Sequence, residues 1–320
     1  METLLDGGAF FEGPRWRDGR WWVSDFFRQV VLTVDPRGRA SEVVRVEGRP
    51  SGLGWLPDGS LLVVSMRDRC VLQRSPSGAL RLYADLSAHC DWHANDMVVA
   101  ADGSAYVGNF GFDLAGGAEP RPTALVRVDL DRTVTPAADR LLFPNGSVIT
   151  PDGRTLVVGE TFGRRLTAFT IAGDGSLSDR RVWADLRAAG IAPDGCCLDA
   201  EGRIWVADGA GHRCCLVAEG GELVREIPSP RGLRFYACML GGDDGRRLLL
   251  CAAPDYDERR RRSADTRRCG RAVVKTSETL NGVTARADGA CATILLLRAG
   301  SQQRRRKSER TRQPRLLGRR

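Results

Sequence analysis

A short pattern of polar and apolar residues recurs six times along the chain. Each copy is a polar turn containing Gly, usually as Asp-Gly, followed by six or seven mainly apolar residues that end in a small or acidic side chain. The copies read RWWVSD after Gly19, SLLVVS after Gly59, SAYVGN after Gly103, RTLVVGE after Gly153, RIWVAD after Gly202 and RRLLLCA after Gly245. Asp-Gly between two apolar runs is a strong hairpin signal, because Gly accepts the positive φ that tight turns require. The pattern therefore predicts a chain built of β-hairpins.

The six repeat glycines lie 40, 44, 50, 49 and 43 residues apart. Each interval has room for roughly four short strands, which is the content of one β-propeller blade. No long amphipathic helix interrupts the repeats. We therefore predict an all-β fold, a six-bladed β-propeller. A central metal site is predicted as well, from the side chains described in the next paragraph. A β-sandwich with irregular turns is the alternative, but a sandwich does not predict a repeat of fixed length.

Equivalent positions in the repeats gather oxygen-bearing side chains. In a propeller the first strand of each blade lines the central tunnel, so counting back seven or eight residues from each repeat glycine samples the tunnel mouth. The positions reached are Glu12, Ser51, Asn95, Asn145, Asp194 and, in the sixth unit, Ala237 or Cys238. Carboxylates and amides converging on one axis suit a hard divalent cation such as calcium or magnesium. Asn-Gly and Asp-Gly pairs such as Asn145-Gly146 and Asp194-Gly195 are also common in ordinary turns. That these side chains recur at the same position of several repeats favours a metal site.

A second polar set follows the glycines. Six or seven residues after each glycine come Asp25, Ser65, Asn109, Glu160, Asp208 and Cys251. Because the second strand of a hairpin returns beside the first, these residues are expected at the same mouth. The acids and the amide in this set are candidates to orient ligands or hold water. The alternative is that they are exposed polar residues at strand ends.

Four motifs in order and in register resemble the signature of a known family. They are Glu12-Gly13-Pro14, His93-Ala94-Asn95-Asp96, Pro144-Asn145-Gly146-Ser147 and Pro193-Asp194-Gly195. Together they resemble the regucalcin/gluconolactonase (sugar-lactone lactonase) family, over a stretch from about Phe10 to Tyr256. The resemblance implies a six-bladed propeller that binds one divalent metal at the top of its tunnel and hydrolyses lactones.

The resemblance also implies roles for individual residues. Glu12, Asn145 and Asp194 would be the metal ligands, Asp194 would also be the general base, and Asn95 would contact the ligand sphere or the substrate. The cation, calcium before magnesium, manganese or zinc, would polarise the lactone carbonyl while a carboxylate takes a proton from water. The implied protein is a lactonase-type carboxylic ester hydrolase that acts on a small-molecule lactone or ester.

One motif departs from the family pattern. Relatives that hydrolyse sugar lactones resemble Arg-x-Asn-Asp where this chain has His93-Ala94-Asn95-Asp96. Without the arginine that would grip a polyhydroxy substrate, a less polar lactone or ester becomes the expectation, and His93 a candidate substrate contact. The alternative is an ordinary loop histidine beside Trp92. The nearby Phe110, Phe112 and Phe162 are expected either to form an apolar wall at the mouth or simply to pack.

Signatures of several other enzyme classes are absent from the sequence. It has no GxSxG elbow, no Walker loop and no GxGxxG fingerprint, which argues against a serine hydrolase, an NTPase and a dinucleotide enzyme. The remaining alternative to a hydrolase is a non-catalytic propeller that binds a small molecule or a protein partner through the same tunnel mouth. The fold alone does not decide between them, because propellers serve both roles.

The net charge of +8 is concentrated at the end of the chain. Residues 301–320 contain nine basic side chains and one acid, whereas residues 1–258 contain 29 basic and 36 acidic side chains. We therefore predict a propeller over residues 1–276 and a basic, low-complexity tail over 277–320, either disordered or a non-native extension. We do not expect the tail to bind nucleic acid, because no aromatic residue stands between its arginines to stack on bases. The segment 271–276 is the predicted closing strand.

Composition indicates the compartment. No apolar run approaches the roughly 20 residues of a membrane helix, and the first residues lack the charge and apolar stretch of a signal peptide. The ten cysteines include two adjacent pairs and no CxxC motif, so they are expected to be reduced and buried. The sequence thus favours a cytoplasmic protein without a membrane span.

Overall fold

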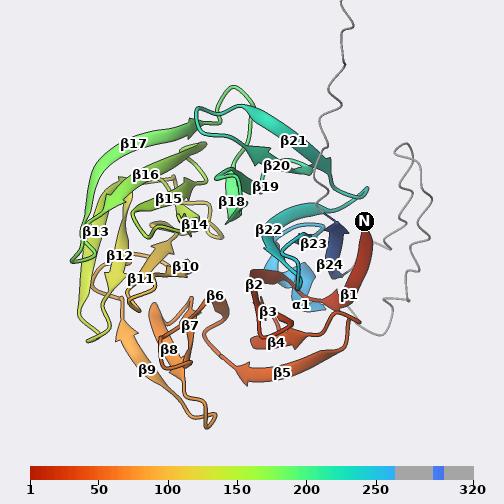
Figure 1. Ribbon diagram of the computed structural model, residues 1–320. Helices are drawn as coiled ribbons and strands as arrows, with labels where there is room; N and C mark the ends of the chain where they lie inside the picture. Colours follow the sequence, from red (N-terminus) through yellow and green to blue (C-terminus); the bar gives the residue numbers. More distant parts are fainter. Residues whose placement is uncertain (264–290, 299–320) are drawn as a thin grey trace, which may run out of the picture.

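The computed structural model describes residues 1–263 and 291–298 of the chain. Within these residues, six four-stranded antiparallel sheets surround a central axis (Figure 1). The innermost strand of each sheet is the first strand of the corresponding repeat. The predicted six-bladed β-propeller is therefore confirmed.

Blades 1 to 5 each consist of four consecutive strands. Blade 1 contains β2 (Phe11–Arg17), β3 (Arg20–Asp25), β4 (Val30–Val34) and β5 (Ala40–Arg45), and blade 2 contains β6 (Pro50–Trp55), β7 (Leu61–Ser65), β8 (Cys70–Arg74) and β9 (Leu80–Asp85). Blade 3 contains β10 (Ala94–Val99), β11 (Ala105–Asn109), β12 (Thr123–Val128) and β13 (Val134–Leu141). Blade 4 contains β14 (Pro144–Ile149), β15 (Thr155–Glu160), β16 (Arg165–Ile171) and β17 (Leu177–Asp185), and blade 5 contains β18 (Pro193–Leu198), β19 (Ile204–Asp208), β20 (Arg213–Val217) and β21 (Leu223–Pro228).

The repeat glycines lie where the hairpin pattern places them. Each occupies the turn between the first and second strand of its blade with a positive φ, for example 94° at Gly103. An L-residue with a Cβ atom is strained in that conformation. The spacing of these glycines along the sequence therefore reports the spacing of the blades.

Blade 6 joins the two ends of the described chain. Its strands are β22 (Arg234–Gly241), β23 (Arg247–Ala253), β24 (Ala292–Arg298) and β1 (Glu2–Gly8). The outermost strand, β1, pairs antiparallel with β24, so the N-terminal strand closes the ring. The predicted boundary after residue 276 assigned 292–298 to the tail, whereas the structure places them in blade 6. The predicted closing strand 271–276 and the rest of the tail lie outside the described residues.

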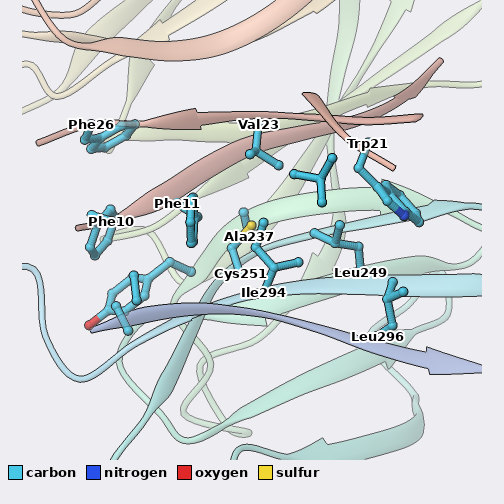
Figure 2. Packing of buried hydrophobic residues seen from close by; sticks show 14 of the residues in the cluster. Phe10, Phe11, Trp21, Val23, Phe26, Ala237, Leu249, Cys251, Ile294 and Leu296 are labelled. Atoms are coloured by element: carbon cyan, nitrogen blue, oxygen red, sulfur yellow. The ribbon is translucent and has the colours of Figure 1, made fainter. Parts of the chain in front are cut away.

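The seam between blade 6 and blade 1 is filled by apolar side chains. Figure 2 shows Phe11 and Val23 of blade 1 facing Ala237, Leu249 and Ile294 of blade 6, and all five are at most 3% exposed. Because a β-strand alternates its side chains between two faces, each inner strand can pack one face on each neighbouring blade. The ring closes through this packing as well as through the shared sheet.

A short helix, α1 (Glu258–Ser263), follows β23. Among the described residues, no helix has the length and apolar character needed to cross a membrane. Eight cysteines are free and buried, in agreement with the expectation. Cys291 is instead disulfide-bonded, so the expectation is wrong at that position.

Candidate functional site

A shared irregularity aims one residue of each innermost strand at the tunnel. All six inner strands carry a register shift next to their second strand, close to the point where they begin. A bulge adds an unpaired residue and redirects a side chain, and bulges recur beside active sites. Five of these shifts leave Ser51, Asn95, Asn145, Asp194 or Tyr236 without a cross-strand partner, whereas Glu12 pairs with Ser24 and borders the shift in β2.

Hydrogen bonds connect three of the predicted site residues across blades 3, 4 and 5. The Asn95 amide donates from Nδ2 to Asn145 Oδ1 over 3.0 Å, and the Asn145 amide donates from Nδ2 to Asp194 Oδ1 over 2.6 Å. Ser51 Oγ extends the chain by donating to Asn95 Oδ1 over 3.3 Å. Residues up to 143 positions apart in the sequence, from Ser51 to Asp194, thus meet at the axis, as the repeat register predicts.

Burial and neighbouring negative charges raise the pKa of both predicted carboxylates, Glu12 and Asp194. Burial, followed by the charges of Asp194 and Asp96, raises the pKa of Glu12 well above its ordinary value, although the Gly13 N–H and Arg15 oppose this rise. Burial likewise raises the pKa of Asp194 to about 8, against the hydrogen bond from Asn145 and with the charges of Asp96 and Asp208. Buried carboxylates this close to one another are therefore disfavoured in their ionised forms unless a cation balances their charge.

Arg15 bridges the tunnel beside these carboxylates. From strand β2 its Nη2 donates to Asp96 Oδ1 over 3.0 Å and to Met97 O over 2.5 Å, both on β10. With Glu12 and Asp194 in their ionised forms, the three carboxylates and one guanidinium here carry a balance of −2. A single divalent cation would neutralise this set.

The donor chemistry of the site fits such a cation. Among the described residues, no group of three or more His, Cys, Asp or Glu side chains could hold a metal ion. A cation at this mouth must therefore use amide oxygens of Asn95 or Asn145 together with the carboxylates of Glu12 and Asp194. Carboxylate and amide oxygens are ligands that calcium and magnesium accept.

The second polar set supports the site through the backbone. Asp25 accepts hydrogen bonds from the N–H groups of Ala9 and Phe10, which lead into β2. Glu160 accepts from the Leu142 N–H and Asp208 from the Ala192 N–H, ahead of β14 and β18. These buried acids were predicted to orient ligands or hold water. The structure shows them fixing the segments that enter the ligand-bearing strands. Asn109 and Ser65 make other contacts, to Thr123 and Asp68.

His93 lies in a row of aromatic rings beside the site. The half-buried imidazole stacks on Trp92 with centroids 5.2 Å apart and meets the Phe110 ring at 5.7 Å. Phe110 in turn lies 4.4 Å from Phe143, the residue that precedes β14. Burial, with the charges of Arg49 and Arg67, lowers the pKa of His93 to about 4, so its imidazole is neutral at neutral pH.

Phe110, Phe112 and Phe162, expected either to form an apolar wall at the mouth or simply to pack, belong to one aromatic cluster that also contains Phe143. Phe112 and Phe162 lie 5.2 Å apart, and both rings contact Phe143. Phe162 is 41% exposed, so one end of this cluster faces solvent. Phe143 was not singled out from the sequence, although it stands two residues before Asn145 just as His93 stands before Asn95.

A buried arginine occupies the equivalent position in blade 2. Arg49, two residues before Ser51, forms an ion pair with Glu258 of α1, and its guanidinium lies 5.2 Å from the centroid of the Phe27 ring. Arg67 also pairs with Glu258, at 3.5 Å. The sequence provided no signal for this contact, because α1 lies more than 200 residues from Arg49.

The sixth inner position differs from the prediction. Counting eight residues back from Gly245 gives Ala237, but the register shift in β22 lies between Phe235 and Ala237 and so contains Tyr236. The sixth hairpin is one residue longer than the count assumed. The fourth hairpin, in which Glu160 comes seven rather than six residues after Gly153, was the available hint that hairpin length varies.

Comparisons with known proteins agree with this geometry. A family model described as SMP-30/Gluconolactonase/LRE-like region matches residues 10–254. The match begins just before Glu12 and ends after β23, so it includes all six of the inner strands described above.

Three known proteins illustrate the similarity. The chain is 30% identical over 252 residues to pentonolactonase XacC of Haloferax volcanii. This match covers 76% of this chain and 81% of XacC. It is 27% identical to XC5397, a gluconolactonase from Xanthomonas campestris. The two structures superpose with a TM-score of 0.65 over 78% of this chain and 84% of the XC5397 chain. Regucalcin, a calcium-binding protein from Agrobacterium tumefaciens, shares the fold at 22% identity, with a TM-score of 0.69 over 80% of this chain and 86% of that chain.

Proposed function

Because the chain belongs to the SMP-30/gluconolactonase/LRE-like family, we propose that it is a lactonase-type carboxylic ester hydrolase that opens a small-molecule lactone or ester. The observation that carries the proposal is the hydrogen-bonded chain from Asn95 through Asn145 to Asp194, at the mouth where Glu12 also lies. The lactonase names of XacC and XC5397 support the reaction class.

In this proposal Glu12, Asn145 and Asp194 hold one divalent cation, calcium before magnesium, manganese or zinc. The oxygen-only donors and the balance of −2 around Arg15 support this choice. When bound, the cation supplies a Lewis acid that polarises the ester carbonyl. The amide of Asn95 orients Asn145, because its Nδ2 donates to the Asn145 oxygen.

Asp194 acts as the general base. Water attacks the carbonyl carbon, its proton passes to the Asp194 carboxylate, and the ring C–O bond breaks as that proton is returned to the leaving alkoxide. The product is the open hydroxy acid. A carboxylate held beside the attacking water is suited to both transfers. The hydrogen bond from Asn145 fixes the orientation of the carboxyl group.

The aromatic row at the mouth favours a less polar substrate than a sugar lactone. His93 is neutral, stacks on Trp92 and meets Phe110 edge to face. Such a surface offers apolar contact and one imidazole, where a polyhydroxy ring would require several donors and acceptors. We therefore propose that His93 and Asn95 contact the substrate, and that apolar lactones or esters are turned over better than gluconolactone.

A lactone and ester panel with several metals tests the function. Chelator-treated protein is expected to hydrolyse nothing and to recover when calcium, magnesium, manganese or zinc is restored. Asp194→Asn should remove at least about 99% of the turnover, because it removes the base while keeping the size of the side chain. Asp199→Asn, which breaks the pair with Arg203 away from the mouth, is the matched control and should retain turnover.

Two results would contradict this proposal. Undiminished turnover in Asp194→Asn would exclude the assigned base. No hydrolysis of any lactone or ester with any of the four metals, together with ligand binding at the mouth, would instead establish the non-catalytic propeller.

A further inference from the structure

Tyr236 occupies the blade 6 position that corresponds to the site residues of the other blades. A Cβ atom built on Gly146 would lie 2.4 Å from Asp194 O of the next blade, and one built on Gly13 would lie 2.5 Å from Ser51 O. The same construction on Gly195 meets Ala237 Cα at 2.7 Å and Tyr236 O at 3.2 Å. Together with the shared register shift, this makes Tyr236 the sixth member of the inner ring.

The hydroxyl of Tyr236 is buried and has no hydrogen-bond partner among the described residues. Tyr236 is only 4% exposed. The other buried tyrosines satisfy their hydroxyls: Tyr106 donates to Gly175 O over 2.7 Å, and Tyr83 lies 3.3 Å from Leu130 O. A buried hydroxyl without a partner destabilises the folded protein, so an unpaired one in a native site calls for an explanation.

The surroundings of Tyr236 suit a donor to a ligand. Its ring lies 4.7 Å from that of Phe10, the residue two positions before Glu12, and its strand β22 packs beside β18, which carries Asp194. Burial, together with the charge of Asp194 and against that of Arg234, raises the pKa of Tyr236. The phenol therefore keeps its proton and can donate it in a hydrogen bond.

We propose that the Tyr236 hydroxyl donates a hydrogen bond to the carbonyl oxygen of the bound substrate. This inference rests on the proposed hydrolase function. Negative charge builds on that oxygen as water attacks, so a preorganised donor stabilises the transition state more than the ground state. The hydroxyl has no partner among the described residues, which is the cost of keeping the donor ready for the substrate.

Tyr236→Phe tests the inference, with Tyr106→Phe as the matched control. Both changes remove only a buried hydroxyl. Tyr236→Phe is expected to lower kcat/KM roughly a hundredfold, mainly through kcat, while its thermal unfolding midpoint stays equal to that of the wild type or rises. Tyr106→Phe loses the bond to Gly175 O, so its midpoint should fall while kcat/KM is unchanged.

The opposite results would overturn the inference. Full kcat/KM in Tyr236→Phe would show that the hydroxyl does not act on the substrate. A fall in the unfolding midpoint as large as that of Tyr106→Phe would show that the hydroxyl has a partner within the protein. Either result leaves the hydrolase proposal standing, whereas absence of turnover in the wild type itself would overturn that proposal.

Discussion

The carboxyl group of Asp194 holds its proton more tightly than an exposed aspartate does. Its pKa rises from the ordinary 3.8 to about 8, chiefly because burial disfavours the charge. The folded protein therefore binds this proton more tightly than the unfolded chain does. Without a cation, the contribution of Asp194 to stability should decline as pH rises from about 4 to about 8. A cation that binds the ionised form should reverse this trend.

Calcium affinity is accordingly expected to rise with pH. Below pH 8 each bound cation must displace a proton from Asp194, so the apparent affinity should increase at least about tenfold per pH unit. Isothermal titration calorimetry between pH 6 and pH 9 measures this slope. Asp194→Asn should lose part of the slope, and Glu12, whose pKa is also raised, accounts for the rest.

An exposed acid provides the control for this titration. Asp152 lies in the blade 4 hairpin turn, and Asp152→Asn should leave the slope unchanged. An affinity in the wild type that does not vary between pH 6 and pH 8 would show that no proton is displaced from the site.

At the residue scale, the sequence identified the side chains that a constant hairpin length brings into register. Glu12, Asn95, Asn145 and Asp194 follow from one count because their hairpins differ by at most one residue. Tyr236 was missed because its hairpin has an additional residue and because a tyrosine does not resemble a metal ligand. The bridge from Arg15 to Asp96 spans 81 positions, and no local pattern records such a contact.

At the scale of elements, the inner strands approach one another closely behind the site residues. Gly146 follows Asn145, and a Cβ atom there would lie 2.4 Å from both Asp194 O and Cys196 N on β18. Only glycine lets β14 and β18 come this near at that level. The distance between Asn145 and Asp194 therefore depends on a neighbouring residue that has no side chain.

Gly146→Ala should damage the site more than the fold. The added methyl group must separate β14 from β18, which we expect to cost about 1–3 kcal/mol of unfolding free energy. The same displacement should weaken calcium binding by about 10–100-fold, because it moves Asn145 and Asp194 apart. Chemical denaturation and calorimetry measure the two effects separately.

Gly153→Ala provides the contrasting case. Gly153 lies in the turn between β14 and β15, with φ of 71°, and a Cβ atom added there would meet no other atom within 4 Å. Its replacement should cost about 1–2 kcal/mol through backbone strain alone and leave calcium affinity intact. Equal affinities for Gly146→Ala and wild type would refute the spacing argument.

Elements were predictable where turn chemistry marks them. Each repeat glycine located an inner hairpin correctly, because few residue types other than glycine adopt the positive φ that a tight turn requires. The role of Asp25, Glu160 and Asp208 was predicted only in outline. That these acids bind backbone N–H groups of the preceding segment depends on the path of a loop, which hydrophobic periodicity does not describe.

At the scale of the whole molecule, the ring is closed by strands from opposite ends of the described chain. Leu5 of β1 pairs with Ile294 of β24, and Asp6 accepts a hydrogen bond from the Thr293 hydroxyl over 2.8 Å. The sequence predicted the number of blades from the repeat but not this closure. Neither β1 nor β24 follows a repeat glycine, and the sequence therefore offered the segment 271–276 as the closing strand instead.

Removing residues 2–8 should therefore weaken the entire propeller. The deletion exposes the edge of β24 and the apolar surface under Leu4 and Leu5, at a cost of about 2–3 kcal/mol. Because β22 packs against β2 as well as β18, a loosened blade 6 should also lower calcium affinity at Glu12 and Asp194. Removing residues 301–320, a longer segment, is the control and should change neither quantity. Thermal unfolding with and without calcium distinguishes the two truncations, and equal midpoints for the 2–8 deletion and the full chain would show that β1 does not hold the ring closed.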